Sequence, residues 1–123
     1  MRMLNLIKHS ISHRESLRTA LEKLVELGTS LTLFVINDQN QLVGTLTDGD
    51  SRRGLLNGLQ ISDSVEKYMR NKFFYVKSDY ALPDLMNAKK QSIKILPVVD
   101  HDMHIIKLIN FEFYHSYLPL DAF

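Results

Sequence analysis

The feature that most constrains the fold of this 123-residue chain is an internal repeat of a strand–turn–strand pattern. Two apolar runs and the polar residue after them recur at one constant offset (98 − 35 = 63): Val35-Ile36, Leu42-Val43 and Thr47, then Val98-Val99, Ile105-Ile106 and Asn110. The helices expected before these runs align at a slightly larger offset (82 − 17 = 65). Units this small cannot bury a sheet face alone. The pattern therefore predicts an α+β fold in which two βαββα repeats, residues 1–61 and 62–123, pack around a pseudo-twofold axis with a ligand cleft between them.

The first repeat has well-marked elements. Apolar residues spaced three or four apart over Leu17–Leu27 predict an amphipathic helix, with Ser16 as its cap and Gly28 as its end. The runs Leu33–Ile36 and Leu42–Leu46 flank a polar turn and predict a β-hairpin. A helix is expected next, with Thr47 and Asp48 as candidate caps, helical composition over 52–56 and a stop at Asn57-Gly58.

The second repeat follows the same order with weaker signals. We expect a strand over Phe73–Val76, a helix with Pro83 in its first turn, and a hairpin formed by Ile93–Val99 and Ile105–Ile109. The inward-facing residues of that helix are predicted to be Leu82, Leu85 and Met86. Before it, Ser62–Ser64 offers caps for a short helix that carries Val65, Tyr68 and Met69, and the segment 3–8 is expected to be a strand or an interface arm.

Composition excludes several classes of function. Fifteen basic and fourteen acidic residues leave a formal charge of +1, which predicts neither a nucleic-acid partner nor an anionic membrane surface. The absence of cysteine excludes disulfides, thiolate metal sites and cysteine nucleophiles. No apolar run approaches the roughly 18 residues that span a bilayer, and the sequence shows no long apolar signal segment, so we expect a cytoplasmic protein. We expect no metal site, because His101 and His104 lie in a hairpin turn where imidazoles are usually solvated. No catalytic residue is predicted.

Polar groups converge where the first hairpin ends. Thr47, Asp48, Gly49 and Asp50 combine a hydroxyl, two carboxylates and a flexible backbone at the expected N-terminus of a helix. Backbone N–H groups and the helix dipole at such a position favour an anionic or polyhydroxylated ligand. The sequence therefore predicts a ligand site in this segment.

The segments LFVINDQNQLVGTLTDGD, ILPVVD and SVEKYM together resemble a tandem pair of cystathionine-β-synthase (CBS) domains, often called a Bateman module. The resemblance covers nearly the whole chain. The family's nucleotide signature corresponds here to Gly44, Thr45-Leu46, Thr47 and Asp50. The resemblance implies that Asp50 accepts hydrogen bonds from ribose hydroxyls and that Thr47 lies near ribose or phosphate.

The second copy departs from this signature. Lys107, Asn110 and Phe113 stand where Gly44, Thr47 and Asp50 stand in the first copy, so we expect at most one ribose site, in the first repeat. The basic residue that often precedes the core strand in the family is also absent, because Thr32 and Ile95 hold those places. Its nearest substitutes are Arg52, Arg53 and Lys94. The predicted ligand-binding residues are Thr47, Asp48, Gly49, Asp50, Arg52 and Arg53, and Asp50→Ala is expected to leave the fold nearly intact.

A narrower resemblance concerns the protein around this module. The phrase GTLTDGDSRRGLLNG is similar to CBS pairs that precede sugar-phosphate nucleotidyltransferase domains, and residues 118–123 resemble the start of such a domain. This implies a fragment that binds AMP, ADP or ATP, regulates an attached C-terminal catalytic domain and is not itself an enzyme. A homodimer through helix faces and the aromatic C-terminal stripe is expected. The alternative is a ligand-free structural dimerisation module, favoured by Asn110, Phe113 and the missing basic residue.

Overall fold

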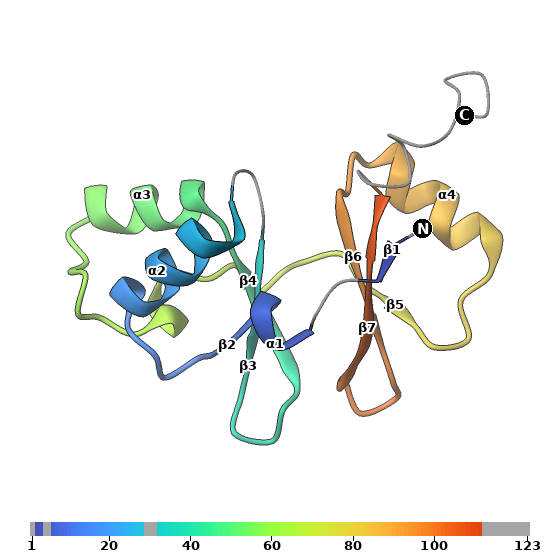
Figure 1. The fold of residues 1–123 in the computed structure, drawn as a ribbon, viewed down its shortest axis with the longest axis horizontal. Coiled ribbons are helices and arrows are strands. Elements are labelled where there is room, and N and C mark those ends of the chain that lie inside the picture. Colours follow the sequence, from blue (N-terminus) through green and yellow to red (C-terminus); the bar gives the residue numbers. More distant parts are fainter. Residues whose placement is uncertain (1, 4–5, 29–31, 112–123) are drawn as a thin grey trace. The chain divides into compact units, whose positions relative to one another are not determined.

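The computed structural model describes residues 2–3, 6–28 and 32–111, which form two compact units (Figure 1). One unit is Leu6–Phe73, and the other combines Met1–Asn5 with Phe74–Phe123. Residues 62–73 thus lie in the first unit, although the predicted repeat boundary falls between residues 61 and 62. The reason is a set of backbone hydrogen bonds to the start of the first long helix, such as Leu17 N–H to Asp63 O at 2.9 Å and Val65 N–H to Glu15 O at 2.7 Å.

The first unit is a three-stranded sheet with helices on it. Its strand order is β2-β3-β4, with β2 parallel and β4 antiparallel to the central strand. The strands are β2 (Ser10–Ser12), β3 (Leu33–Ile36) and β4 (Leu42–Leu46), and the helices are α1 (Leu6–His9), α2 (Leu17–Leu27), α3 (Asp48–Leu56) and the 3-10 helix η1 (Val65–Lys67). The predicted first helix, hairpin and second helix are therefore confirmed.

Local chemistry explains the ends of α2, and burial explains its orientation. Ser16 Oγ accepts a hydrogen bond from Thr19 N–H at 3.3 Å, and Gly28 ends the helix with a φ of 98°, which favours glycine. Three α2 residues, Leu17, Ala20 and Leu24, are buried against apolar residues of all three strands. Val65 and Tyr68 belong to the same core, so the segment around η1 is part of this unit's interior.

The second unit is a four-stranded sheet in the order β1-β7-β6-β5. Its elements are β1 (Arg2–Met3), β5 (Val76–Lys77), α4 (Leu82–Lys90), β6 (Ile95–Val99) and β7 (Ile105–Asn110). The strand predicted at residues 73–76 starts only at Val76, and the segment 3–8 divides into a strand of this sheet and helix α1 of the other unit. The predicted aromatic stripe and Phe113 lie outside the described residues, apart from Phe111, which is buried in this core.

Helix α4 packs on the core with fewer of its apolar residues than predicted. Leu85 packs on the core and Ala88 is fully buried, whereas Leu82 and Met86 are 66% and 63% exposed. The prediction that Leu82 and Met86 face inward is therefore wrong. The small side chain of Ala88 lets the helix approach the strands with positions 85 and 88, which are neighbours on one helix face, in contact.

The internal repeat is confirmed at the level of hydrogen-bond register. Val35 pairs with Gly44 and Val98 pairs with Lys107, and a bulge follows both valines. The two hairpin turns also match, because Asn40 and Met103, which stand at the same offset as the valines, have φ values of 61° and 69°. The two repeats thus share one hairpin backbone despite little identity in their turns.

Candidate functional site

The N-terminus of α3 is held by a reciprocal pair of side chains. Thr47 Oγ1 accepts a hydrogen bond from Asp50 N–H at 3.3 Å, and Asp50 Oδ2 accepts from Thr47 N–H and from Thr47 Oγ1, each at 3.0 Å. This is the capping box that satisfies the free N–H groups of a helix start. The hydroxyl and one carboxylate oxygen of the predicted ligand site therefore already stabilise the helix.

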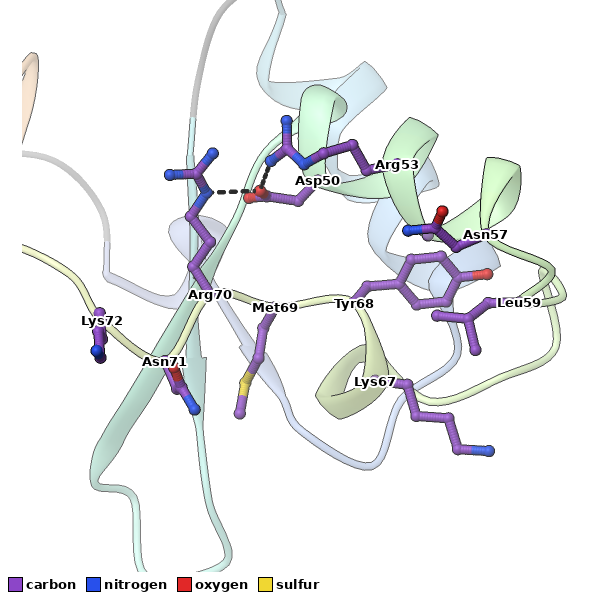
Figure 2. A pocket seen from close by; sticks show the side chains of 11 residues that line it. Asp50, Arg53, Asn57, Leu59, Lys67, Tyr68, Met69, Arg70, Asn71 and Lys72 are labelled. Atoms are coloured by element: carbon purple, nitrogen blue, oxygen red, sulfur yellow. Dashed lines mark hydrogen bonds and ion pairs between the residues drawn. The ribbon is translucent and has the colours of Figure 1, made fainter.

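The other oxygen of Asp50 is paired with two arginines (Figure 2). Arg70 Nε donates to Asp50 Oδ1 at 2.8 Å, and the Arg53 guanidinium donates to the same atom. The Asp50 side chain is 1% exposed, whereas those of Arg53 and Arg70 are 54% and 63% exposed. A buried carboxylate is unfavourable unless it is paired and hydrogen-bonded, and the two guanidiniums meet that requirement.

Arg70 reaches Asp50 because its backbone runs beside β4. Thr45 and Arg70 exchange two backbone hydrogen bonds of 3.0 and 2.9 Å. This close approach requires glycine at position 44, since a Cβ there would lie 2.5 Å from Met69 Sδ and 2.8 Å from Arg70 O. Gly44 of the family signature is thus explained by packing of the segment 69–70, and Lys107 at the matching place in the second repeat instead lies over Tyr80, 5.2 Å from the ring centroid.

Tyr68 forms a wall beside α3. Its hydroxyl donates to Gln60 O at 2.6 Å, and burial raises the pKa of this phenol. A Cβ added to Gly54 would lie 2.2 and 2.4 Å from two Tyr68 ring carbons, so the ring occupies the space that any other residue at position 54 would fill. The glycine sets the distance between α3 and the segment after η1.

A cavity of about 460 Å³ opens between α3 and this segment. Its lining consists of Asp50, Arg53, Gly54 and Asn57 from α3 and its C-terminal end, Leu59 from the following loop, and residues 67–72. Four of these residues are basic and one is acidic, a local formal charge of +3 (4 − 1), although the whole chain carries only +1. Concentrated positive charge around a partly apolar cavity favours an anionic small molecule.

The structure brings together only some of the predicted ligand-binding residues. Asp50 and Arg53 line the cavity, Thr47 caps the helix, and Asp48, Gly49 and Arg52 are not among the lining residues. Lys94 is exposed and belongs to the other unit. The basic residues that sequence reasoning missed are Lys67, Arg70 and Lys72. The short segment KYMRNK carries all three, and that local density was the available signal.

Two other types of site are not seen in the described residues. Within residues 2–3, 6–28 and 32–111, no helix is long and apolar enough to cross a membrane. The same ranges contain no group of three or more metal-ligating side chains. His104, one of the two turn histidines, has its Nδ1 3.2 Å from Asp100 Oδ2.

Comparisons with known proteins find relatives in sequence and in structure. A protein of Helicobacter pylori strain J99, named only as uncharacterized, is 32% identical over 109 residues, which cover 87% of this chain and 32% of that protein. This chain therefore spans about a third of the length of the curated relatives it matches. The solved CBS domains of a transcriptional regulator from Streptococcus pneumoniae are similar with a TM-score of 0.72 and 17% identity, covering 89% of each chain.

A second solved structure is more similar in sequence. It is CBSX2 in complex with AMP, with a TM-score of 0.67 and 29% identity, covering 83% of this chain and 80% of that one. Residues 7–50 also match the family model of the CBS domain. These residues include β2 to β4, α2 and the start of α3. The first repeat thus matches the CBS domain family, and the α+β fold of the chain is the fold of solved CBS-domain structures.

Proposed function

We propose that this chain is a regulatory module that binds an adenine nucleotide, AMP, ADP or ATP, in the cavity of its first unit. The observation that carries the proposal is a single buried carboxylate, Asp50, set among four basic side chains in a cavity of about 460 Å³. A carboxylate is a strong acceptor for ribose hydroxyls, and guanidinium and ammonium groups are the usual partners of phosphate. The AMP complex of the 29% identical CBSX2 supports the choice of ligand.

The module would act on another domain of a longer protein. The resemblance of residues 44–58 to CBS pairs that precede sugar-phosphate nucleotidyltransferase domains suggests such a domain on the C-terminal side, and this chain would supply no catalytic group.

The protein would work in the cytoplasm as a homodimer. A dimer through helix faces is supported by Leu55 and Leu56 of α3, which are 42% and 86% exposed. Ligand bound at the start of α3 would then influence a surface at its end.

The alternative is a structural dimerisation module that binds no ligand. One observation favours it, since Asp50 already has hydrogen-bonding partners for both oxygens. A ligand must therefore compete with Arg53 and Arg70 for this carboxylate.

Thermal denaturation of the chain with AMP, ADP, ATP and GTP separates the two functions. Adenine nucleotides should raise the melting temperature, because a ligand at 100 times its Kd stabilises the native state by about 2.7 kcal/mol. Arg53→Gln should reduce this shift, and Arg52→Gln, on the same helix but outside the cavity lining, should not. The absence of a shift with every nucleotide would favour the structural alternative.

A further inference from the structure

The atom of Asp50 that a ribose would need is occupied. Thr47 holds Oδ2 through its backbone N–H and its hydroxyl, so Oδ1 is the oxygen left for a ligand. Arg53 and Arg70 both donate to that oxygen. Asp50 is also the one carboxylate among the described residues that line the cavity. A sugar hydroxyl can therefore reach it only by displacing a guanidinium.

We infer that Arg53 and Arg70 make this site selective for phosphorylated nucleosides and exclude free nucleosides, an inference that rests on the proposed nucleotide function. A neutral nucleoside that displaces Arg70 from Asp50 replaces an ion-paired hydrogen bond, charged at both donor and acceptor, by a hydroxyl bond that is charged only at the acceptor. A phosphate group brings about −1.5 to −2 charges at pH 7 and offers the displaced guanidinium a bidentate partner. The arginines then bind phosphate while Asp50 Oδ1 accepts the sugar hydroxyls.

The positions of the two arginines suit such an exchange. Arg70 has its backbone fixed by the two hydrogen bonds to Thr45, while its side chain is 63% exposed. Arg53 lies one helical turn after Asp50 on α3, and its side chain is 54% exposed. Both side chains can therefore change partner without movement of the backbone. Asp50 itself is locked in place by the capping box, so the acceptor stays fixed as its partners change.

The test is a comparison of AMP with adenosine by isothermal titration calorimetry on three proteins: the wild type, Arg70→Met and Arg52→Met. Wild type should bind AMP at least about tenfold more tightly than adenosine. Arg70→Met should weaken AMP by about 10- to 100-fold, the range expected for one charge-assisted hydrogen bond, and should leave adenosine unchanged or tighter. The preference for AMP would then fall at least about tenfold. Arg52→Met removes an exposed charge from the same helix outside the cavity lining and should keep the preference.

The outcomes separate this inference from the function on which it rests. If the wild type binds no AMP, both are overturned. If AMP binds but Arg70→Met weakens AMP and adenosine by the same factor, or wild type binds the two equally, only the selectivity role is overturned. Circular dichroism checks that each variant is folded. Should Arg70→Met fail to fold, Arg53→Met gives the same comparison, because Arg53 donates to the same oxygen of Asp50.

Discussion

Asp50 couples the start of a helix to two ion pairs, so its loss affects the fold as well as any ligand. We expect Asp50→Ala to lower the free energy of unfolding by about 2–4 kcal/mol, because a helix cap contributes about 1 kcal/mol and a hydrogen bond to a charged group about 1.5–3 kcal/mol. This replaces the expectation from sequence that Asp50→Ala leaves the fold nearly intact. Urea denaturation measures the loss. Asp48→Ala is the control: it removes an exposed carboxylate from the same helix turn and should cost less than about 1 kcal/mol.

Replacement of Gly54 by any larger residue is predicted to destabilise the fold. In Gly54→Ala the new Cβ must displace the Tyr68 ring, which we expect to cost about 1–3 kcal/mol despite the better helix propensity of alanine. Gly49→Ala, also in α3, places its Cβ at ordinary contact distances of 3.6 and 3.7 Å and should be neutral or stabilising by up to about 1 kcal/mol. Equal denaturation midpoints for the two variants would contradict the proposed contact between Gly54 and Tyr68.

What the sequence can reveal at this scale depends on the distance between partners along the chain. Thr47 and Asp50 lie within one helical turn, and the Thr-x-x-Asp spacing predicts a helix start from local chemistry alone. Arg70 is far from Asp50 in the sequence and reaches it because its backbone pairs with Thr45 of β4. No periodicity encodes that contact, so the most exposed partner of the site was missed.

At the scale of elements, the two hairpin turns make the same hydrogen bonds with different side chains. Asn37 Oδ1 accepts from two backbone N–H groups, of Gln39 and Gln41, and Asp100 Oδ1 accepts in the same way from Asp102 and His104. The amide of Asn37 thus accepts in one repeat the hydrogen bonds that the carboxylate of Asp100 accepts in the other. We expect Asp100→Asn to preserve the hairpin, with a circular dichroism spectrum like that of the wild type at pH 7.

The same pair predicts a difference in acid. The backbone N–H of His104 is the main group that lowers the pKa of Asp100, with smaller effects from Asp102 N–H and the His104 side chain. A carboxylate with a lowered pKa in the folded state contributes stability above its unfolded pKa of about 3.9, and that stability is lost as pH falls through the folded value. Asp100→Asn lacks this titration, so its melting temperature should fall less than that of wild type between pH 5 and pH 2. Parallel pH profiles would contradict this account.

Helix α4 shows why an element can be predicted correctly and oriented incorrectly. Its start follows from Pro83, and Asp84 Oδ2 accepts from Ala81 N–H at 2.9 Å, both local signals. The face toward the sheet depends instead on how closely the helix can approach. A pattern of large apolar residues favoured Leu82 and Met86, whereas the fully buried residue of the helix is Ala88, which is too small to stand out in such a pattern.

On the scale of the whole molecule, exposed apolar side chains on helices predict self-association. Val25 and Leu56 of the first unit are 80% and 86% exposed, in addition to Leu82 and Met86 of the second. We expect sedimentation equilibrium to give a homodimer at micromolar concentration. Leu56→Lys should shift the mass toward the monomer with little change in unfolding free energy, because the side chain makes few contacts in the monomer. A monomeric wild type at every micromolar concentration would contradict the prediction.

The matching hairpins of the two repeats were predictable because their apolar pattern occurs twice in the sequence. The constant offset between the two copies is visible in their apolar pairs, and the paired residues of the two hairpins correspond at the same offset on both sides of the bulge. The boundary between compact units was not predictable in the same way. Residues 62–73 join the first unit through Val65, Tyr68 and backbone bonds to α2, which are contacts between segments that carry no common periodicity.

The pairing of β1 with β7 also has a consequence for the order of events during synthesis. Arg2 pairs with Asn110, so the ribosome must add the whole of the chain between these two positions before the first strand can meet its partner. At about 5–20 residues per second this takes roughly 5–20 s. All of Leu6–Phe73 emerges within that interval. The first unit can therefore fold during translation, whereas β1 can pair at the edge of the other sheet only after β7 has been synthesised.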